Sequence, residues 1–191
     1  MNRCCAACAH DPPAFDRTLA LADYTAPLDR LLQDLKFSAR LPLASALGSL
    51  LARRATSLNI GDPSCLGADP LPDPVLLPVP LSRERLAERG FNQALEIARL
   101  ISKHRQIQLD YSSCRRTRLT PPQASLPLKE RIKNIQGVFQ CDKNLQGLNI
   151  ALVDDVMTTG ASLNELAKTL KQAGAAHVEC WVIARTLPKT N

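Results

Sequence analysis

The chain has 191 residues, a formal net charge of +6, 45% hydrophobic residues and only 4% aromatic residues. This length suits one α/β domain, whose core must be built from Leu, Ile, Val and Ala because aromatic residues are scarce. No apolar run in the sequence is long enough to span a bilayer, and no hydrophobic stretch follows the charged N-terminus as it would in a signal peptide. We therefore expect a cytoplasmic protein without membrane insertion.

The positive charge is concentrated in one part of the chain. Between Ser82 and Lys133, twelve Lys or Arg residues stand against five Asp or Glu residues, and the rest of the chain is close to neutral. A local surplus of this kind is typical of a polyanionic partner, either a pyrophosphate group or a nucleic acid. A solvated basic face is the alternative, and the charge pattern alone does not separate the two.

Composition divides the chain into four stretches. Residues 1–18 form a Cys-bearing lead-in. Residues 19–56 are predicted to be an N-terminal helical hood, because leucines recur at helical spacing in two successive patterns after Pro27. Residues 57–73 are rich in Gly and Pro and are predicted to be a linker. Residues 74–191 are predicted to be the main domain.

Strand and helix patterns alternate within the main domain. Apolar runs predict strands at 74–79, 149–153 and 177–184, with a weaker strand at 106–111, and helical spacing predicts helices at 93–103 and 161–173. Strands that are separated by helices pair in parallel through right-handed crossovers. The predicted fold class is therefore α/β, with a doubly wound, mostly parallel sheet.

Two consecutive carboxylates follow the apolar strand at 149–153, and a helix begins a few residues later. Ligands of open parallel sheets bind beyond the carboxyl ends of strands, and the free N–H groups at a helix start attract a phosphate. Paired carboxylates accept hydrogen bonds from a vicinal diol such as that of ribose, while Thr and Ser hydroxyls donate to a phosphate. The predicted ribose- and phosphate-binding residues are Asp154, Asp155, Thr158, Thr159, Gly160, Ala161 and Ser162.

A Thr or Ser helix cap behind an acidic turn is the plainer interpretation of this loop. It explains one Thr and one Asp, but not two acids, two Thr, a Gly and a Ser within ten residues. The phosphate-binding patterns G-x-x-x-x-G-K-[ST] and G-x-G-x-x-G do not occur in the sequence. Residues Val153 to Ser162 instead resemble the type I phosphoribosyltransferase signature at essentially every position. This resemblance implies that fold class, with phosphoribosyl pyrophosphate as the ligand and Mg²⁺ as the cofactor.

Further segments resemble the ComF family of competence proteins, over a region from about Cys5 to Thr186. The matching segments are PVPLS at 78–82, RGFNQ at 89–93, Arg115-Arg116-Thr117, Gln123, Leu126, Arg131, Asn134 and Phe139, with Tyr24 and Leu35-Lys36-Phe37 nearer the start. The resemblance implies a zinc-binding N-terminal piece joined to a phosphoribosyltransferase domain. It also implies a role in competence and DNA uptake, with single-stranded DNA and other competence proteins as expected partners.

The family resemblance also implies roles for the basic residues. The residues expected to meet the pyrophosphate are Arg89, Arg83 and Arg85, and those expected on a flap over the site, at 114–136, are Arg115, Arg116, Arg131 and Lys133.

Two alternatives stay open for residues 82–93. Arg83 and Arg85 are interleaved with glutamates, so an exposed, self-paired helix face competes with a role in binding. Asn92 and Gln93 are expected either to cap the next helix or to contact the ligand.

Seven cysteines are present, and four of them, Cys65, Cys114, Cys141 and Cys180, are scattered singly. Cys180 lies in an apolar run and is expected to be buried. Cys5 and Cys8 have the spacing of half a zinc site, so Zn²⁺ is a candidate metal. Three interpretations compete: a truncated finger without metal, a site completed by Cys4 or His10, and a start codon assigned too late.

Three functions follow from these patterns. The first is a ComF-type protein that binds phosphoribosyl pyrophosphate, or a ribose 5-phosphate moiety, in competence or DNA uptake. The second is an active phosphoribosyltransferase, for which the sequence identifies neither catalytic residues nor the acceptor. The third is a non-catalytic accessory protein that binds single-stranded DNA, although the low aromatic content argues against a base-stacking platform.

Overall fold

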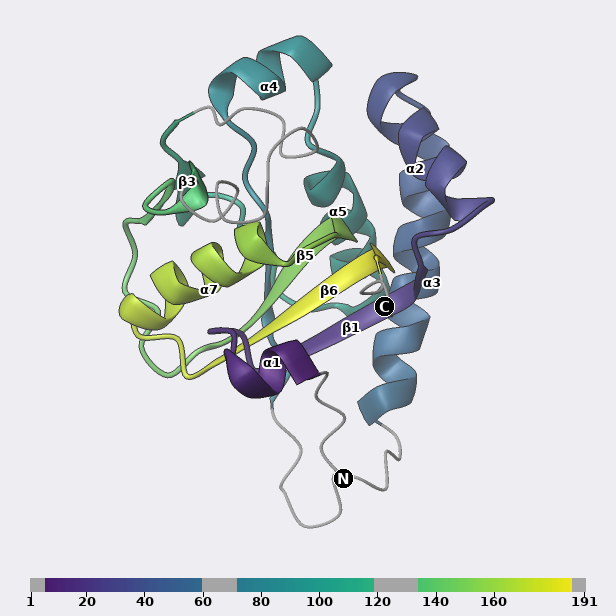
Figure 1. Ribbon diagram of the computed structural model, residues 1–191. Helices are drawn as coiled ribbons and strands as arrows, with labels where there is room; N and C mark the ends of the chain where they lie inside the picture. The colour runs from purple at the N-terminus through teal and green to yellow at the C-terminus, as the bar shows by residue number, and fades with distance from the viewer. Residues whose placement is uncertain (1–5, 60–71, 119–133, 187–191) are drawn as a thin grey trace.

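Four parallel strands form the central sheet of the computed structural model, which describes residues 6–59, 72–118 and 134–186 (Figure 1). The strand order is β1-β6-β5-β2, and every neighbouring pair in this sheet is parallel. The strands are β1 (Arg17–Asp23), β2 (Val75–Pro78), β5 (Asn149–Met157) and β6 (His177–Arg185).

Helices cover both faces of the sheet. On one face α2, α3 and α5 pack together, and on the other face lie α7 and the two-stranded hairpin β3-β4 (Figure 1). The helices are α1 (Ala6–His10), α2 (Leu28–Phe37), α3 (Leu41–Asn59), α4 (Arg83–Arg89), α5 (Gln93–Arg105) and α7 (Ala161–Gln172), and the hairpin strands are β3 (Cys114–Arg116) and β4 (Phe139–Cys141). The predicted doubly wound, mostly parallel α/β fold is thereby confirmed.

The two hydrophobic cores meet at the central strand β5. Ala151 and Val153 belong to the core under α2, α3 and α5, whereas Ile150 and Leu152 belong to the core under α7. Successive side chains of a strand point to opposite faces, and a sheet covered on both faces needs apolar residues at every position. This explains why β5 reads as a continuous apolar run until its first carboxylate.

The segment 19–56, predicted to be a helical hood, begins with a strand and continues with two helices. Residues Arg17–Asp23 form β1, an edge strand in parallel register with β6, and the backbone N–H of Tyr24 continues the ladder to the carbonyl of Arg185. Leu and Ala, which dominate this segment, are good helix formers, so only the partner strand reveals its conformation. Helices α2 and α3 follow as predicted, and their leucines belong to the same core as the sheet.

The remaining predicted elements are mostly found. Strands β2, β5 and β6 and helices α5 and α7 form where the sequence patterns predict them. The weak strand expected at 106–111 is reduced to a single parallel bridge between Leu109 and Leu76. Of the predicted linker, residues 60–71 lie outside the described residues. Within the described ranges, no helix combines the length and the apolar character needed to cross a membrane.

Candidate functional site

The acid pair lies at the carboxyl end of β5. The sequence predicts that this strand ends before the carboxylates, but it continues through Asp154 and Asp155 to Met157. Asp154 lies in register with Val182 of β6. Asp154 is half-buried and Asp155 is only 3% exposed. Strand pairing therefore fixes the backbone of both acids.

A tight turn connects β5 to α7. Gly160 precedes the helix with a φ of 76°, a left-handed conformation that favours glycine. The hydroxyl of Thr159 accepts a hydrogen bond from the backbone N–H of Ala161 at 3.3 Å, and the carbonyl of Gly160 accepts one from Asn164 at 2.8 Å. The turn thus presents the start of α7 and exposed Thr hydroxyls at the end of the strand.

An open pocket brings most of the predicted loop residues together. Its lining combines one carboxylate, three hydroxyl-bearing side chains and the first turn of α7, which is a suitable place for a phosphate. Asp155 does not line it. The lining residues are Asp154, Val156, Met157, Thr158, Thr159, Gly160, Ala161, Ser162 and Leu163.

The two acids are electrostatically coupled. The pKa of Asp154 is raised well above 3.8, mainly by loss of hydration and secondly by repulsion from Asp155. The positive charge of Lys36 acts in the opposite direction. The backbone N–H of Asp155 donates to Asp154 Oδ1 at 2.9 Å, which also opposes the rise. Asp154 therefore takes up a proton more readily than an ordinary aspartate.

Lys36, in the last turn of α2, is a site residue for which the sequence predicted no role. Its Nζ lies 2.5 Å from Asp155 Oδ2, an ion-pair distance, although that oxygen forms no hydrogen bond of acceptable geometry within the described part of the chain. Basic residues are common in the last turn of any helix, so the pattern at 28–37 does not single out Lys36.

Arg89 lies beside the acid pair at the end of α4. Its Nη1 donates to Gln93 Oε1 at 2.5 Å, and its guanidinium stands over the ring of Phe37, 5.7 Å from the centroid. Burial lowers the pKa of Arg89, and the negative charge of Asp155 opposes this effect. Arg89 is thus within electrostatic reach of the predicted ribose-binding carboxylates.

Of the two roles expected for Asn92 and Gln93, the structure shows helix capping by Asn92. Asn92 caps α5, because its side-chain oxygen accepts from the backbone N–H groups of Ala94 and Leu95, and its amide donates to the carbonyl of Val79 at the end of β2. Gln93 is 5% exposed and orients Arg89. Both residues position the basic side of the site.

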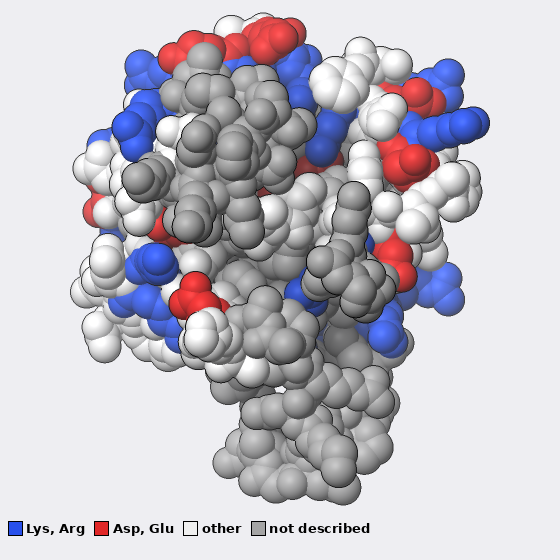
Figure 2. Space-filling view, viewed as in Figure 1, with Lys and Arg blue, Asp and Glu red and all other residues white. Residues whose placement is uncertain are grey.

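The other two arginines of α4 differ in exposure. Arg83 is exposed and Arg85 is half-buried, and in the described part of the chain neither forms an ion pair with Glu84 or Glu88. Arg85 is close enough to lower the pKa of both Arg89 and Arg116 by repulsion. Figure 2 shows Lys and Arg side chains gathered around the upper part of this face, with Asp and Glu side chains among them.

The hairpin β3-β4 places Arg115 and Arg116, two of the residues expected on the flap, in different surroundings. Arg115 is exposed and forms an ion pair with Asp142, the residue that follows β4. Arg116 is half-buried, stands over the ring of Phe139 at 5.6 Å, and has a pKa that burial lowers and Asp154 raises. Arg116 is therefore the one within reach of the acid pair. Arg131 and Lys133 lie outside the described residues.

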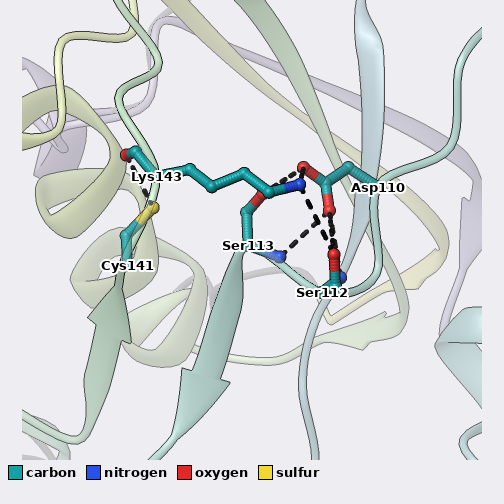
Figure 3. A network of polar contacts seen from close by, with 5 residues as sticks. All are labelled: Asp110, Ser112, Ser113, Cys141 and Lys143. Carbon is teal, nitrogen blue, oxygen red and sulfur yellow. Dashed lines mark hydrogen bonds and ion pairs between the residues drawn. The ribbon is translucent and has the colours of Figure 1, made fainter.

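A polar network fixes the base of this hairpin (Figure 3). The carboxylate of Asp110 accepts from the backbone N–H groups of Ser112 and Ser113, each at 3.0 Å, and forms an ion pair with Lys143 at 3.3 Å. Burial opposes ionisation, but the hydrogen bonds from Ser113 and Ser112 outweigh it and lower the pKa of Asp110 to about 2. The network ties the start of β3 to the chain after β4.

The cysteines are less scattered than the sequence suggests. Cys114 and Cys141 face each other across the hairpin, and burial together with Cys141 raises the pKa of the Cys114 thiol. Cys180 is fully buried, as predicted. Cys8 lies in α1, Cys5 lies outside the described residues, and no cluster of three or more potential metal ligands occurs in the described ranges.

Solved structures provide only distant likenesses. TT1426 from Thermus thermophilus is 16% identical, with a TM-score of 0.44, over 78% of this chain and 85% of that one. A hypoxanthine phosphoribosyl transferase from Trypanosoma cruzi is 14% identical, with a TM-score of 0.44, over 77% and 69%. Overlap at this level says nothing about activity.

Sequence relatives are much closer, although no family model matches the chain. DNA utilization protein YhgH of Shigella flexneri is 38% identical over 189 residues, which cover 96% of this chain and 78% of that protein. Competence protein F of Haemophilus influenzae is 32% identical over 95% and 78%, and competence protein ComFC of Bacillus subtilis is 37% identical over 59% and 45%. The chain therefore belongs to the ComF family, together with YhgH and competence protein F.

Proposed function

We propose that this protein binds phosphoribosyl pyrophosphate, or a ribose 5-phosphate moiety, at the pocket between β5 and α7. The observation that carries the proposal is the joining of a strand-end carboxylate and a helix N-terminus in one open pocket. A sugar phosphate presents both a diol and a phosphate within a short span, so it satisfies both ends of this pocket.

Each part of the ligand has a counterpart in the site. The 5′-phosphate binds the N–H groups at the start of α7 and the hydroxyls of Thr158 and Thr159, and Asp154 accepts from the ribose diol. The pyrophosphate lies on the basic side of the site, at Arg89 and Arg116. Both acids attract Arg89, and Asp154 attracts Arg116. Both arginines are partly buried, which strengthens their attraction for an anion.

Mg²⁺ is expected to arrive with the ligand, because pyrophosphate oxygens chelate the ion and leave it partly hydrated. When bound, Mg²⁺ neutralises charge on the pyrophosphate. The side chains around the site then orient the sugar and balance the remaining charge. Asp154 and the start of α7 hold the sugar phosphate, and the arginines hold the pyrophosphate.

The biological setting is proposed from the relatives. YhgH is named for DNA utilization and the Haemophilus protein for competence. A phosphoribosyl-binding protein of this family suits the handling of DNA or of nucleotides derived from it. Other competence proteins are the proposed partners.

A transferase reaction is the first extension of this proposal. Departure of pyrophosphate from the ribosyl carbon leaves an oxocarbenium-like centre, and positioned charges on both sides favour that step. The observation in its favour is the electrostatic coupling of Arg89 to both acids and of Arg116 to Asp154. The acceptor, which takes the ribosyl carbon, is a nucleophile of unassigned class.

Binding of single-stranded DNA is the second extension. It is favoured by the exposed Arg83 and the half-buried Arg85 of α4, which form no ion pair in the described part of the chain. Arg85 is also close enough to act on Arg89 and Arg116. Phosphate contacts of this kind weaken strongly as salt concentration rises.

Titration calorimetry with phosphoribosyl pyrophosphate and Mg²⁺ tests the central proposal. We expect saturable binding by the wild type and strongly weakened binding by Asp154→Asn, which keeps the shape of the side chain but removes its charge. Absence of binding by the wild type contradicts the proposal. Release of pyrophosphate on addition of candidate acceptors tests the transferase, and salt-dependent binding of an oligonucleotide tests the DNA-binding extension.

A further inference from the structure

The ion pair between Lys36 and Asp155 joins the N-terminal helices to the acid pair. The Asp155 side chain is 4% exposed, whereas the Lys36 side chain is 24% exposed. A buried carboxylate needs a partner for its charge, and Lys36 supplies it. The ammonium group is not fully enclosed, however, and keeps some access to solvent.

The backbone around Lys36 is held in place from both sides. Leu32 and Leu35 of the same helix are almost completely buried in the core of the sheet. Phe37, the next residue, contacts the guanidinium of Arg89, which Gln93 holds in turn. Packing therefore sets the backbone position of Lys36, and the ion pair with Asp155 sets the position of its ammonium group.

An ammonium group has three N–H donors, and the contact with Asp155 Oδ2 occupies only one side of the Lys36 ammonium group. Asp155 also acts on Arg89, whose guanidinium stands over the ring of Phe37, so the end of α2 and the end of α4 meet near Asp155. The proposed function places the pyrophosphate at Arg89.

We infer that Lys36 is a specificity-determining residue of this site. Its ammonium group holds the Asp155 carboxylate in place and supplies the positive charge that distinguishes a pyrophosphorylated sugar from the plain sugar phosphate. This inference rests on the proposed function, but it assigns a role to a residue outside the loop between β5 and α7. The N-terminal helices, through one side chain, select for the leaving group.

Calorimetry with two ligands, phosphoribosyl pyrophosphate with Mg²⁺ and ribose 5-phosphate, tests this inference. We expect Lys36→Met to lose about ten- to hundredfold in affinity for the pyrophosphorylated sugar, which is the range of a charged hydrogen bond. Its affinity for ribose 5-phosphate falls much less. Lys36→Arg keeps the charge and recovers most of the discrimination between the two ligands.

Arg40→Met is the matched control, because Arg40 also forms an ion pair with α2, through Asp34 at 3.0 Å, but lies on an exposed surface. It is expected to leave both affinities unchanged. If Lys36→Met lowers both affinities equally, Lys36 has a merely structural role and the inference fails. Unchanged affinities in Lys36→Met overturn it as well. A wild type that binds neither ligand overturns the proposed function itself, so the two failures are distinguishable.

Discussion

The acidic side of the site comes from one short stretch of chain, whereas its basic side comes from three separate elements. Asp154 and Asp155 lie at the end of β5, and the turn into α7 follows them directly. Lys36, Arg89 and Arg116 come from α2, α4 and β3, and only the fold brings them to the acids. The acidic side is thus a local motif, and the basic side is a tertiary arrangement that depends on packing.

The largest effect is expected in the local motif, from Gly160→Ala. Gly160 has a φ of 76°, and an alanine there is strained by about 1–2 kcal/mol although its Cβ finds no close contact. Relief of that strain turns the N–H groups away from the phosphate. Loss of two charged hydrogen bonds corresponds to about a hundredfold weaker binding, measurable by calorimetry.

Gly147→Ala is the control for this change. Gly147 has a φ of 74° and open space for a Cβ, but lies between β4 and β5, at the other end of the strand. It should lose similar stability in thermal unfolding without any loss of affinity. If both variants bind the ligand as the wild type does, the turn is not the phosphate site.

A smaller effect is expected on the basic side, where adjacent arginines provide a matched pair. Arg116→Gln should weaken binding of phosphoribosyl pyrophosphate about tenfold, the value of one charged contact. Arg115→Gln should have almost no effect, because Arg115 is exposed and paired with Asp142. Equal losses in the two variants would show that the hairpin acts through general charge and not through one positioned side chain.

The acid pair itself should reduce stability. Because the folded-state pKa of Asp154 is raised, the proton-bound form favours folding, and this contribution is lost as the pH rises through the raised pKa. We expect Asp154→Asn to be more stable than the wild type at pH 8, with a difference that shrinks as the pH falls from the raised pKa towards 3.8. Urea unfolding at several pH values measures it, and a destabilised Asn variant at pH 8 contradicts the expectation.

The smallest effect is expected at the hairpin base. Asp110→Asn should cost about 1 kcal/mol at neutral pH, since its hydrogen bonds weaken and the contact with Lys143 loses its charge. The pKa of Asp110 is lowered to about 2. The stabilisation by its carboxylate is therefore fully present above pH 3.8 and is lost as the pH falls towards 2. A difference between the variant and the wild type that persists unchanged below pH 2 would exclude this explanation.

The difference between the local acidic motif and the tertiary basic side also explains which features the sequence predicts. The sequence predicts the turn and the helix start that follow β5, because these residues lie next to one another and form local backbone structure. Their role in binding stays a prediction. The strand β1 is missed, since Leu and Ala suit a helix equally and only β6 selects the extended form. Lys36 is missed for the same reason, because its partner lies more than a hundred residues away. The roles of Arg115 and Arg116 look identical in sequence and differ only through their positions on β3.

The strand order also affects how the molecule is made. The first strand, β1, lies beside the last strand, β6, with Arg17 opposite Glu179. On a ribosome, β1 and α2 emerge long before their partners in the sheet and at the acid pair. Contacts of such high sequence separation form slowly, because a long chain segment must close first. Assembly of the candidate site is therefore expected to wait until β5 and β6 have been synthesised.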